Sequence, residues 1–144
     1  KWKAAPDRVF IIDVRTLEEF LFVGHPDMAW KIPVFAQTYE WDAAKGCFPM
    51  RPLPDFVARV SEVAKQDDTV MLMCRSGGRS AMGVNMIASA GFKYAYTILD
   101  GMEGDKVEDP ESVFNGMPMR NGWKNSGLPW TYQINPDKLK LSAL

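Results

Sequence analysis

A single cysteine is surrounded by arginine, serine and glycine in the segment CRSGGRS, residues 74–80. Arg75 and Arg79 place positive charge near the sulfur of Cys74, and positive charge lowers the pKa of a thiol, so we expect the nucleophilic thiolate to be populated near neutral pH. The same cations can bind an anion. This spacing therefore predicts a cysteine nucleophile inside an anion-binding loop.

Two adjacent glycines give the segment a second set of donors. Gly77 and Gly78 let the backbone curl until successive N–H groups point inward, which forms a concave anion site. A helix that begins near Arg79 or Ser80 would add the positive end of its dipole. The alternative interpretation is structural, with Cys74 as a small buried residue that ends a core strand before a charged turn.

The elements on either side of this loop follow from the apolar pattern. Val9–Asp13 is a nearly continuous apolar run typical of a buried strand, and Thr16 with Glu19 forms a capping box for a helix that ends near Gly24. Alternating strands and helices favour a parallel α/β sheet covered on both faces, whose ligands bind at the carboxyl ends of the strands. The remaining predicted elements are a helix from Pro54, a strand at Thr69–Met73, a helix at Arg79–Ala90 ended by Gly91, and a strand at Ala95–Leu99.

Two regions have no clear periodic pattern. Residues 25–52 are rich in turn formers and aromatic side chains and predict an irregular surface segment, in which AWKIPV could hold a short strand. Residues 105–122 are polar and irregular, and form either a lid or a solvated insertion. We expect one domain over residues 1–144, with a polar insertion around 105–122 and a C-terminal extension after about 130.

The totals for the chain exclude several classes of function. The 144 residues carry a formal net charge of −1, which gives no support for a nucleic acid or an anionic membrane as partner. No apolar run approaches the ~20 residues of a membrane helix, so no membrane insertion is expected. Two cysteines and one histidine are too few for a structural zinc site, and we expect neither a metal nor a cofactor. The sequence leaves two compartments open, the cytoplasm and the bacterial periplasm. The periplasm is considered because the sequence starts at Lys1, as an exported protein could.

The segment CRSGGRS resembles the active-site loop of the rhodanese family. The segments IIDVRTLEEF, Gly24-His25, GFKYAYTILDGMEG and GWKNSGLP are similar to other signatures of that family and follow in the same order, so that the resemblance spans about residues 9 to 129. It implies a rhodanese-like α/β fold, with a parallel five-stranded sheet and helices on both faces. It also implies a sulfurtransferase.

The resemblance implies a reaction centred on Cys74. This residue would attack the outer sulfur of thiosulfate or a related persulfide donor, hold it as a persulfide, and pass it to an acceptor, either a small thiophile such as cyanide, a thiol or a protein thiol. The implied donor is thus a small sulfur-containing anion. Arg75 and Arg79 would bind its oxyanion end, and the arginine-rich loop favours thiosulfate-like anions over mercaptopyruvate. The implied substrate-binding residues are Arg75, Ser76, Gly77, Gly78, Arg79 and Ser80, the last through its hydroxyl.

Two alternatives belong to other classes. Cysteine-dependent phosphatases and arsenate reductases share this fold, but their loops have seven residues from cysteine to arginine, whereas Cys74 to Arg79 is six. The shorter loop makes a smaller ring of amides, which the family comparison associates with a single sulfur atom. A rhodanese-like sulfur-carrier or interaction module is the other alternative, although non-catalytic modules commonly lack the cysteine that this chain keeps.

Several further residues support the loop in this interpretation. Asp13 and Arg15 are expected to form a structural ion pair at a strand end, and Glu19 to pair with an arginine as well as cap its helix. His25 is expected to pack or hydrogen-bond, and Cys47 to be an incidental thiol rather than a sulfur acceptor. Four aromatic residues could either line the mouth of the site or pack beneath a long loop: Trp30, Tyr39, Trp41 and Phe48.

Overall fold

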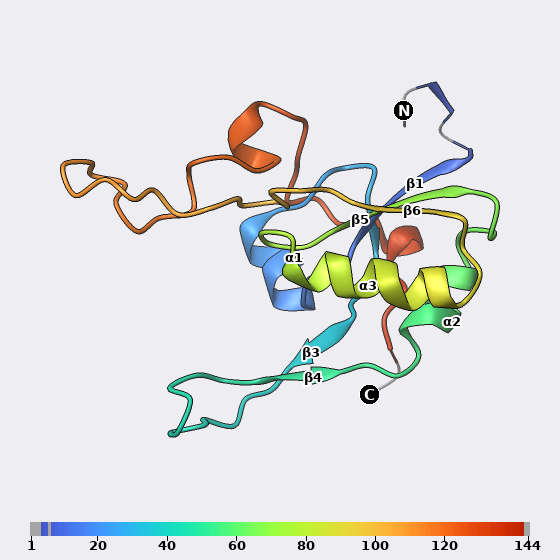
Figure 1. The fold of residues 1–144 in the computed structure, drawn as a ribbon, viewed down its shortest axis with the longest axis horizontal. Helices are drawn as coiled ribbons and strands as arrows, with labels where there is room; N and C mark the ends of the chain where they lie inside the picture. The colour runs from blue at the N-terminus through green and yellow to red at the C-terminus, as the bar shows by residue number, and fades with distance from the viewer. Residues whose placement is uncertain (1–3, 6, 143–144) are drawn as a thin grey trace.

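The computed structural model describes residues 4–5 and 7–142, and a parallel sheet lies at its centre (Figure 1). The strands of this sheet lie in the order β2-β1-β5-β6, and all neighbours are parallel. Their bounds are Val9–Asp13 for β1, Trp30–Lys31 for β2, Thr69–Met73 for β5 and Tyr94–Thr97 for β6. The register pairs Asp13 with Met73, so β1 and β5 end side by side and deliver the residues that follow them to one edge of the sheet.

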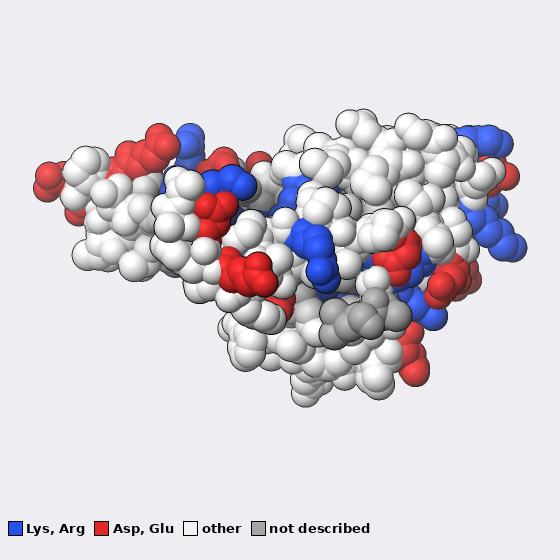
Figure 2. Space-filling model, turned by 90° about the horizontal axis from the view of Figure 1, so that it is seen from below, with Lys and Arg blue, Asp and Glu red and all other residues white. Residues whose placement is uncertain are grey.

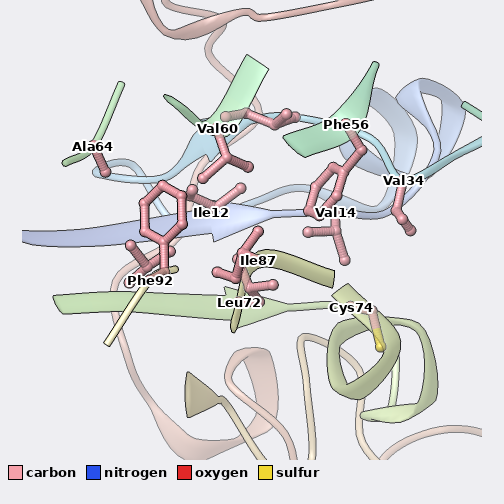
Figure 3. Close-up of a cluster of buried hydrophobic side chains, with 12 residues drawn as sticks. Ile12, Val14, Val34, Phe56, Val60, Ala64, Leu72, Cys74, Ile87 and Phe92 are labelled. Atoms are coloured by element: carbon pink, nitrogen blue, oxygen red, sulfur yellow. The ribbon is translucent and has the colours of Figure 1, made fainter. Parts of the chain in front are cut away.

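Three α-helices accompany the sheet in the described part of the chain: α1 at Leu17–Val23, α2 at Phe56–Ser61 and α3 at Gly78–Ser89. The larger core cluster joins α2 and α3 to one face of β1 and β5 through Phe56, Val60, Ile87, Ile12 and Leu72 (Figure 3). A smaller cluster on the opposite face of the sheet contains Ile11, Met28 and Ala29, with Trp123 packed against it. Alternate side chains of β1 therefore enter different clusters, which explains why its sequence is apolar almost throughout.

The predicted α/β fold with a parallel sheet is confirmed, but the sheet has four strands among the described residues where the resemblance implied five. Two further strands, β3 at Phe35–Gln37 and β4 at Met50–Pro52, pair antiparallel with each other in a separate sheet. The short strand expected within AWKIPV is confirmed as β2, whereas the expectation of an irregular segment is wrong where β3 and β4 form. These strands have only two or three residues each, which is too short for an alternating pattern to emerge from the sequence.

Two segments lie outside this framework of strands and helices. Residues 105–122 contain no helix or strand, are joined internally by a bridge between Val107 and Asn115, and extend away from the sheet (Figure 1, orange). The chain after residue 130 returns to the body, where Leu139 lies beside Lys31 of β2 and the Lys140 N–H donates to the Lys31 carbonyl at 2.9 Å. This returning segment covers the edge of the sheet that β2 would otherwise expose.

Charged side chains of both signs are interspersed on the face of the molecule seen in Figure 2. This face has no broad region of one charge, in keeping with the formal net charge of −1. Among the described residues, no helix has the length and apolar character needed to cross a membrane.

Candidate active site

Cys74 lies directly after β5 and four residues before the start of α3 at Gly78. Its side chain is only 1% exposed and belongs to the larger core cluster. Figure 3 shows it at one end of that cluster, with the sulfur directed away from the aliphatic side chains. The core thus holds the β-carbon firmly while the sulfur reaches the loop between strand and helix.

Two donors of the loop hydrogen-bond to the sulfur. The Gly77 N–H donates to the Cys74 Sγ at 3.1 Å, and the Ser80 hydroxyl lies 3.5 Å from the same atom. Burial acts to raise the pKa of Cys74, but the Ser80 hydroxyl and the amides of Ser80, Gly77 and Ser76 outweigh it and hold this pKa below its ordinary value. The sequence suggested that the arginines would lower this pKa, whereas the main lowering causes in the structure are hydrogen bonds.

A left-handed glycine makes this geometry available. Gly77 caps α3 at φ 116°, a backbone conformation that other residues rarely adopt, and its N–H consequently turns toward the sulfur. No side chain caps α3, so the amides of its first turn are not occupied by a capping oxygen. The strand, the glycine and the helix start together form the cradle that the sequence predicted.

The loop is held from outside by a turn that includes Gly101. The Met102 N–H donates to the carbonyl of Cys74 at 2.8 Å, and the amides of Glu103 and Gly104 donate to the carbonyl of Arg75 at 3.0 and 3.2 Å. These bonds hold the carbonyls of Cys74 and Arg75 toward the outside of the loop, so that its backbone N–H groups line the inner surface. Sequence reasoning missed this function of the turn, although the glycines that break the chain after residue 97 marked its position.

Arg79 and Glu19 form a two-pronged ion pair across the site. The guanidinium nitrogens of Arg79 lie 2.6 and 2.7 Å from the two carboxylate oxygens of Glu19. Burial acts to raise the pKa of Glu19, but Arg79 and the Thr16 amide together hold it below its usual range. Glu19 also completes the predicted capping box, since it accepts from the Thr16 N–H at 3.0 Å. Two nitrogens of Arg79 are therefore engaged by a protein carboxylate, and its binding of the oxyanion end of a donor stays a prediction.

A pocket of about 320 Å³ opens beside the sulfur. This volume lies at the lower end of the usual range for ligand pockets, so the pocket can hold a small ligand. Met50, carried by β4, lines the pocket and places its sulfur 3.7 Å from Arg79 Nη1. Nothing in the sequence around Met50 indicated this role, because it depends on the fold of the β3–β4 hairpin. The lining residues are Glu19, Met50, Cys74, Arg75, Ser76, Gly78 and Arg79.

Asp13 and Arg15 belong to a buried charged network outside the pocket lining. Arg15 donates hydrogen bonds to the Asp13 carboxylate from Nε at 3.0 Å and from Nη2 at 2.6 Å. Its Nη2 also donates to the Gly24 carbonyl at 2.7 Å. Lys31, which sequence reasoning missed, lies 3.9 Å from Asp13 and also donates to the Arg15 carbonyl. Burial lowers the pKa of Lys31 to about 7, even though Asp13 acts to raise it. The network joins β1, β2 and the end of α1, which is the structural support expected of Asp13 and Arg15.

His25 packs away from the pocket, as expected. Its ring stacks on Phe20 with 3.7 Å between centroids, and its Nδ1 lies 3.1 Å from the Pro26 carbonyl. Burial holds the pKa of His25 below its usual value. His25 does not line the pocket of Cys74, so its position is that of a packing residue rather than a general base.

The second cysteine and the aromatic residues also lie outside the pocket. Cys47 is exposed in the turn between β3 and β4, beside an edge-on contact of Trp41 with Phe48. Tyr39 and Phe48 line a different hollow on this hairpin, together with Gln37 and Thr38. Tyr39, Trp41 and Phe48 therefore lie on the hairpin, whereas Trp30 lies in β2 and packs against the larger core cluster. None of these four aromatic residues lines the pocket of Cys74.

Removal of the Ser80 hydroxyl tests the origin of the lowered thiol pKa. In Ser80→Ala, the main lowering contact is lost, so the pKa of Cys74 is expected to rise toward that of an ordinary thiol. Alkylation of Cys74 by iodoacetamide should then slow on the order of tenfold at neutral pH and recover at higher pH. The measurement is the pH dependence of this alkylation, followed by peptide mass. As a control, Ser61→Ala removes an exposed helix hydroxyl and should leave the pH midpoint of Cys74 alkylation unchanged. An unchanged pH midpoint in Ser80→Ala would contradict this account.

The described part of the chain holds no cluster of three or more histidine, cysteine, aspartate or glutamate side chains that could bind a metal ion. The groups that line the pocket are the thiol of Cys74, the Glu19–Arg79 ion pair, Arg75, Ser76, Gly78 and Met50.

Comparisons with known proteins agree with the fold described above. Residues 1–107 match the family model described as Rhodanese-like domain. The chain is 32% identical over 127 residues to the uncharacterized protein RP600 of Rickettsia prowazekii, covering 88% of this chain and 85% of that one. It is 34% identical over 90 residues to the chloroplastic thiosulfate sulfurtransferase 16 of Arabidopsis thaliana, covering 62% of this chain and 68% of the relative. The crystal structure of Rv0390 from M. tuberculosis superposes with a TM-score of 0.69 at 28% identity, over 92% of both chains.

Proposed function

This chain belongs to the rhodanese-like domain family, and on that basis we propose that it is a sulfurtransferase that carries sulfane sulfur on Cys74. The observation that supports the proposal most directly is the sulfur of Cys74, which accepts hydrogen bonds from Gly77 and Ser80 at the edge of a small pocket. A merely structural cysteine in the core has no need of such donors. The thiosulfate sulfurtransferase among the similar proteins points to the same reaction class.

The proposed cycle has two displacements. The thiolate of Cys74 attacks the outer sulfur of the donor, a new S–S bond forms, and the donor's own S–S bond breaks. With thiosulfate, sulfite leaves with the electron pair and Cys74 is left as a persulfide anion. Cyanide then attacks the terminal sulfur, thiocyanate departs, and the thiolate is regenerated.

The loop has a specific task at each stage. In the resting protein the Gly77 amide and the Ser80 hydroxyl stabilise the thiolate, which favours the attacking form of Cys74. After transfer, the negative charge resides on the added sulfur, about one S–S bond length of ~2 Å farther out. The inward amides of the short loop are the donors that can stabilise it there. Because these amides are fixed before the reaction, little reorganisation is needed when charge moves.

Loading with thiosulfate tests the proposal directly. The parent protein is expected to gain the mass of one sulfur atom per chain, to lose it on addition of cyanide, and to produce thiocyanate catalytically. Cys47→Ser should retain near-normal turnover, because Cys47 is exposed on the hairpin and does not line the pocket. Absence of both sulfur gain and turnover in the parent protein, with thiosulfate and also with an organic thiosulfonate donor, would refute the proposal.

The same preparation should be offered an aryl phosphate and arsenate. Hydrolysis or reduction of these compounds without sulfur loading would instead favour the cysteine-dependent phosphatase and arsenate reductase class. The six residues from Cys74 to Arg79 are the feature that argues for sulfur over a phosphoryl group.

A further inference from the structure

The charge of the pocket differs from what its arginines suggest. Glu19, Arg75 and Arg79 are its charged lining residues besides Cys74, which gives one net positive charge before the thiol ionises and none afterwards. Arg79 is bound on both oxygens of Glu19, at 2.6 and 2.7 Å, so its donors are directed toward that carboxylate. The thiolate form of the protein therefore presents a pocket with no net charge to an arriving donor.

Glu19 cannot easily swing away from this position. Its carboxylate accepts from Arg79 and from the backbone N–H of Thr16, and the two side chains of the ion pair are only 19% and 18% exposed. Ion pairs with this limited exposure are screened less by salt than surface pairs are. The negative charge of Glu19 is thus a fixed property of the pocket rather than a mobile surface charge.

One side of the same pocket is apolar. Met50 is the single large apolar side chain among the lining residues, and β4 brings it against Arg79. A donor composed only of sulfur and oxygen has no carbon group to pack against Met50, whereas a donor with a carbon substituent can bury that carbon against this side chain. The pocket therefore combines a cancelled arginine charge with an apolar contact.

We infer that Glu19 determines donor specificity by cancelling the charge of Arg79, so that the pocket favours an organic persulfide or other singly charged organic donor over the dianion thiosulfate. This inference rests on the proposed function and narrows its substrate class. A dianion brings two negative charges toward a thiolate and a carboxylate. A donor in which carbon replaces one charged oxygen brings only one, and gains the contact with Met50.

The variant Glu19→Gln isolates this charge. Glutamine at this position of a capping box can still accept from the helix start, so the variant is expected to fold. The matched control is Glu18→Gln, which removes a carboxylate from the adjacent position of α1. Glu18 accepts from the Tyr39 hydroxyl and does not line the pocket of Cys74. Both variants change the net charge of the protein equally, and only one changes the charge of the pocket.

The first measurement does not require sulfur transfer. Iodoacetamide and iodoacetate alkylate a thiolate by the same displacement of iodide, but only iodoacetate is charged. In a Cys47→Ser background, the ratio of iodoacetate to iodoacetamide rate at Cys74 is expected to rise on the order of tenfold in Glu19→Gln and to stay within about twofold in Glu18→Gln. Equal ratios in the two variants, or an equal loss of both rates in Glu19→Gln, would overturn the assigned role of Glu19.

The second measurement compares two donors of sulfane sulfur. Thiosulfate releases sulfite, whereas the methanethiosulfonate anion has a methyl group in place of one charged oxygen and releases methanesulfinate. The ratio of kcat/KM for methanethiosulfonate to that for thiosulfate is expected to fall about tenfold in Glu19→Gln, through a gain on thiosulfate. If Glu19→Gln changes the ratio of the alkylation rates but leaves the ratio of kcat/KM for the two donors unchanged, the inferred donor class is wrong. If neither donor loads the parent protein while the alkylation ratio still moves, the proposed function fails and the charge role of Glu19 stands.

Discussion

Replacement of Cys74 by serine is expected to abolish sulfur loading and to lower the rate of thiocyanate formation at least about a thousandfold, to the level of the uncatalysed mixture. A serine hydroxyl does not ionise at neutral pH and cannot form a persulfide, so no covalent intermediate remains. The assay is intact mass after thiosulfate treatment, together with thiocyanate production.

The fold should tolerate this change. Serine is close to cysteine in size, and its oxygen can accept from the Gly77 amide and the Ser80 hydroxyl that now contact the sulfur. We therefore expect the free energy of unfolding to change by no more than about 2 kcal/mol. Cys47→Ser makes the same chemical change at an exposed site and controls for the loss of a thiol. Sulfur loading that persists in Cys74→Ser and disappears in Cys47→Ser would show that Cys47 is the carrier.

Substitution of Gly101 by alanine is expected to cause the second large effect. Gly101 has φ 64°, and a β-carbon placed there would lie 2.5 Å from the carbonyl oxygens of both Cys74 and Arg75. Those oxygens are part of the backbone of the active-site loop, so they cannot move aside as the end of a flexible side chain could. The loop must shift, and the donors around the sulfur shift with it.

For Gly101→Ala we expect a loss of roughly 3 kcal/mol in the free energy of unfolding, a fall in Tm of about 10 °C, and a decrease in turnover of at least about a hundredfold. Thermal unfolding and single-turnover sulfur loading below the new Tm measure the two effects separately. Gly116→Ala is the matched control, because Gly116 has φ 80° but no atom lies within 4 Å of the position that its β-carbon would take. It should cost about 1 kcal/mol and leave turnover unchanged. Equal effects of the two variants would contradict the argument from close approach.

Local signals in the sequence predicted the elements that carry the site. The capping box of Thr16 and Glu19 forms as expected, and β5 has the predicted bounds Thr69–Met73. The paired glycines at the start of α3 predicted the curled loop, in which Gly77 is left-handed. These features depend on residues a few positions apart, and short-range geometry is what a sequence pattern encodes most directly.

Contacts between distant residues could not be predicted in the same way. Glu19 and Arg79 are 60 positions apart, and the sequence suggested that Glu19 pairs with an arginine without indicating that this would occupy Arg79. Lys31 is a polar residue in a strand of two residues, where no pattern distinguishes a buried amine from an exposed one. Met50 enters the pocket only because β3 and β4 pair across a long turn. Each of these depends on tertiary packing rather than on local propensity.

The turn after β6 limits the insertions that the loop of Cys74 can accept. The amides of Met102, Glu103 and Gly104 are bonded to the carbonyls of the cysteine loop, so the two segments form one mechanical unit although α3 and β6 separate them in the sequence. A residue inserted into the loop would move those carbonyls off their donors. Lengthening of the loop thus requires a concerted change in a turn that does not line the pocket of Cys74.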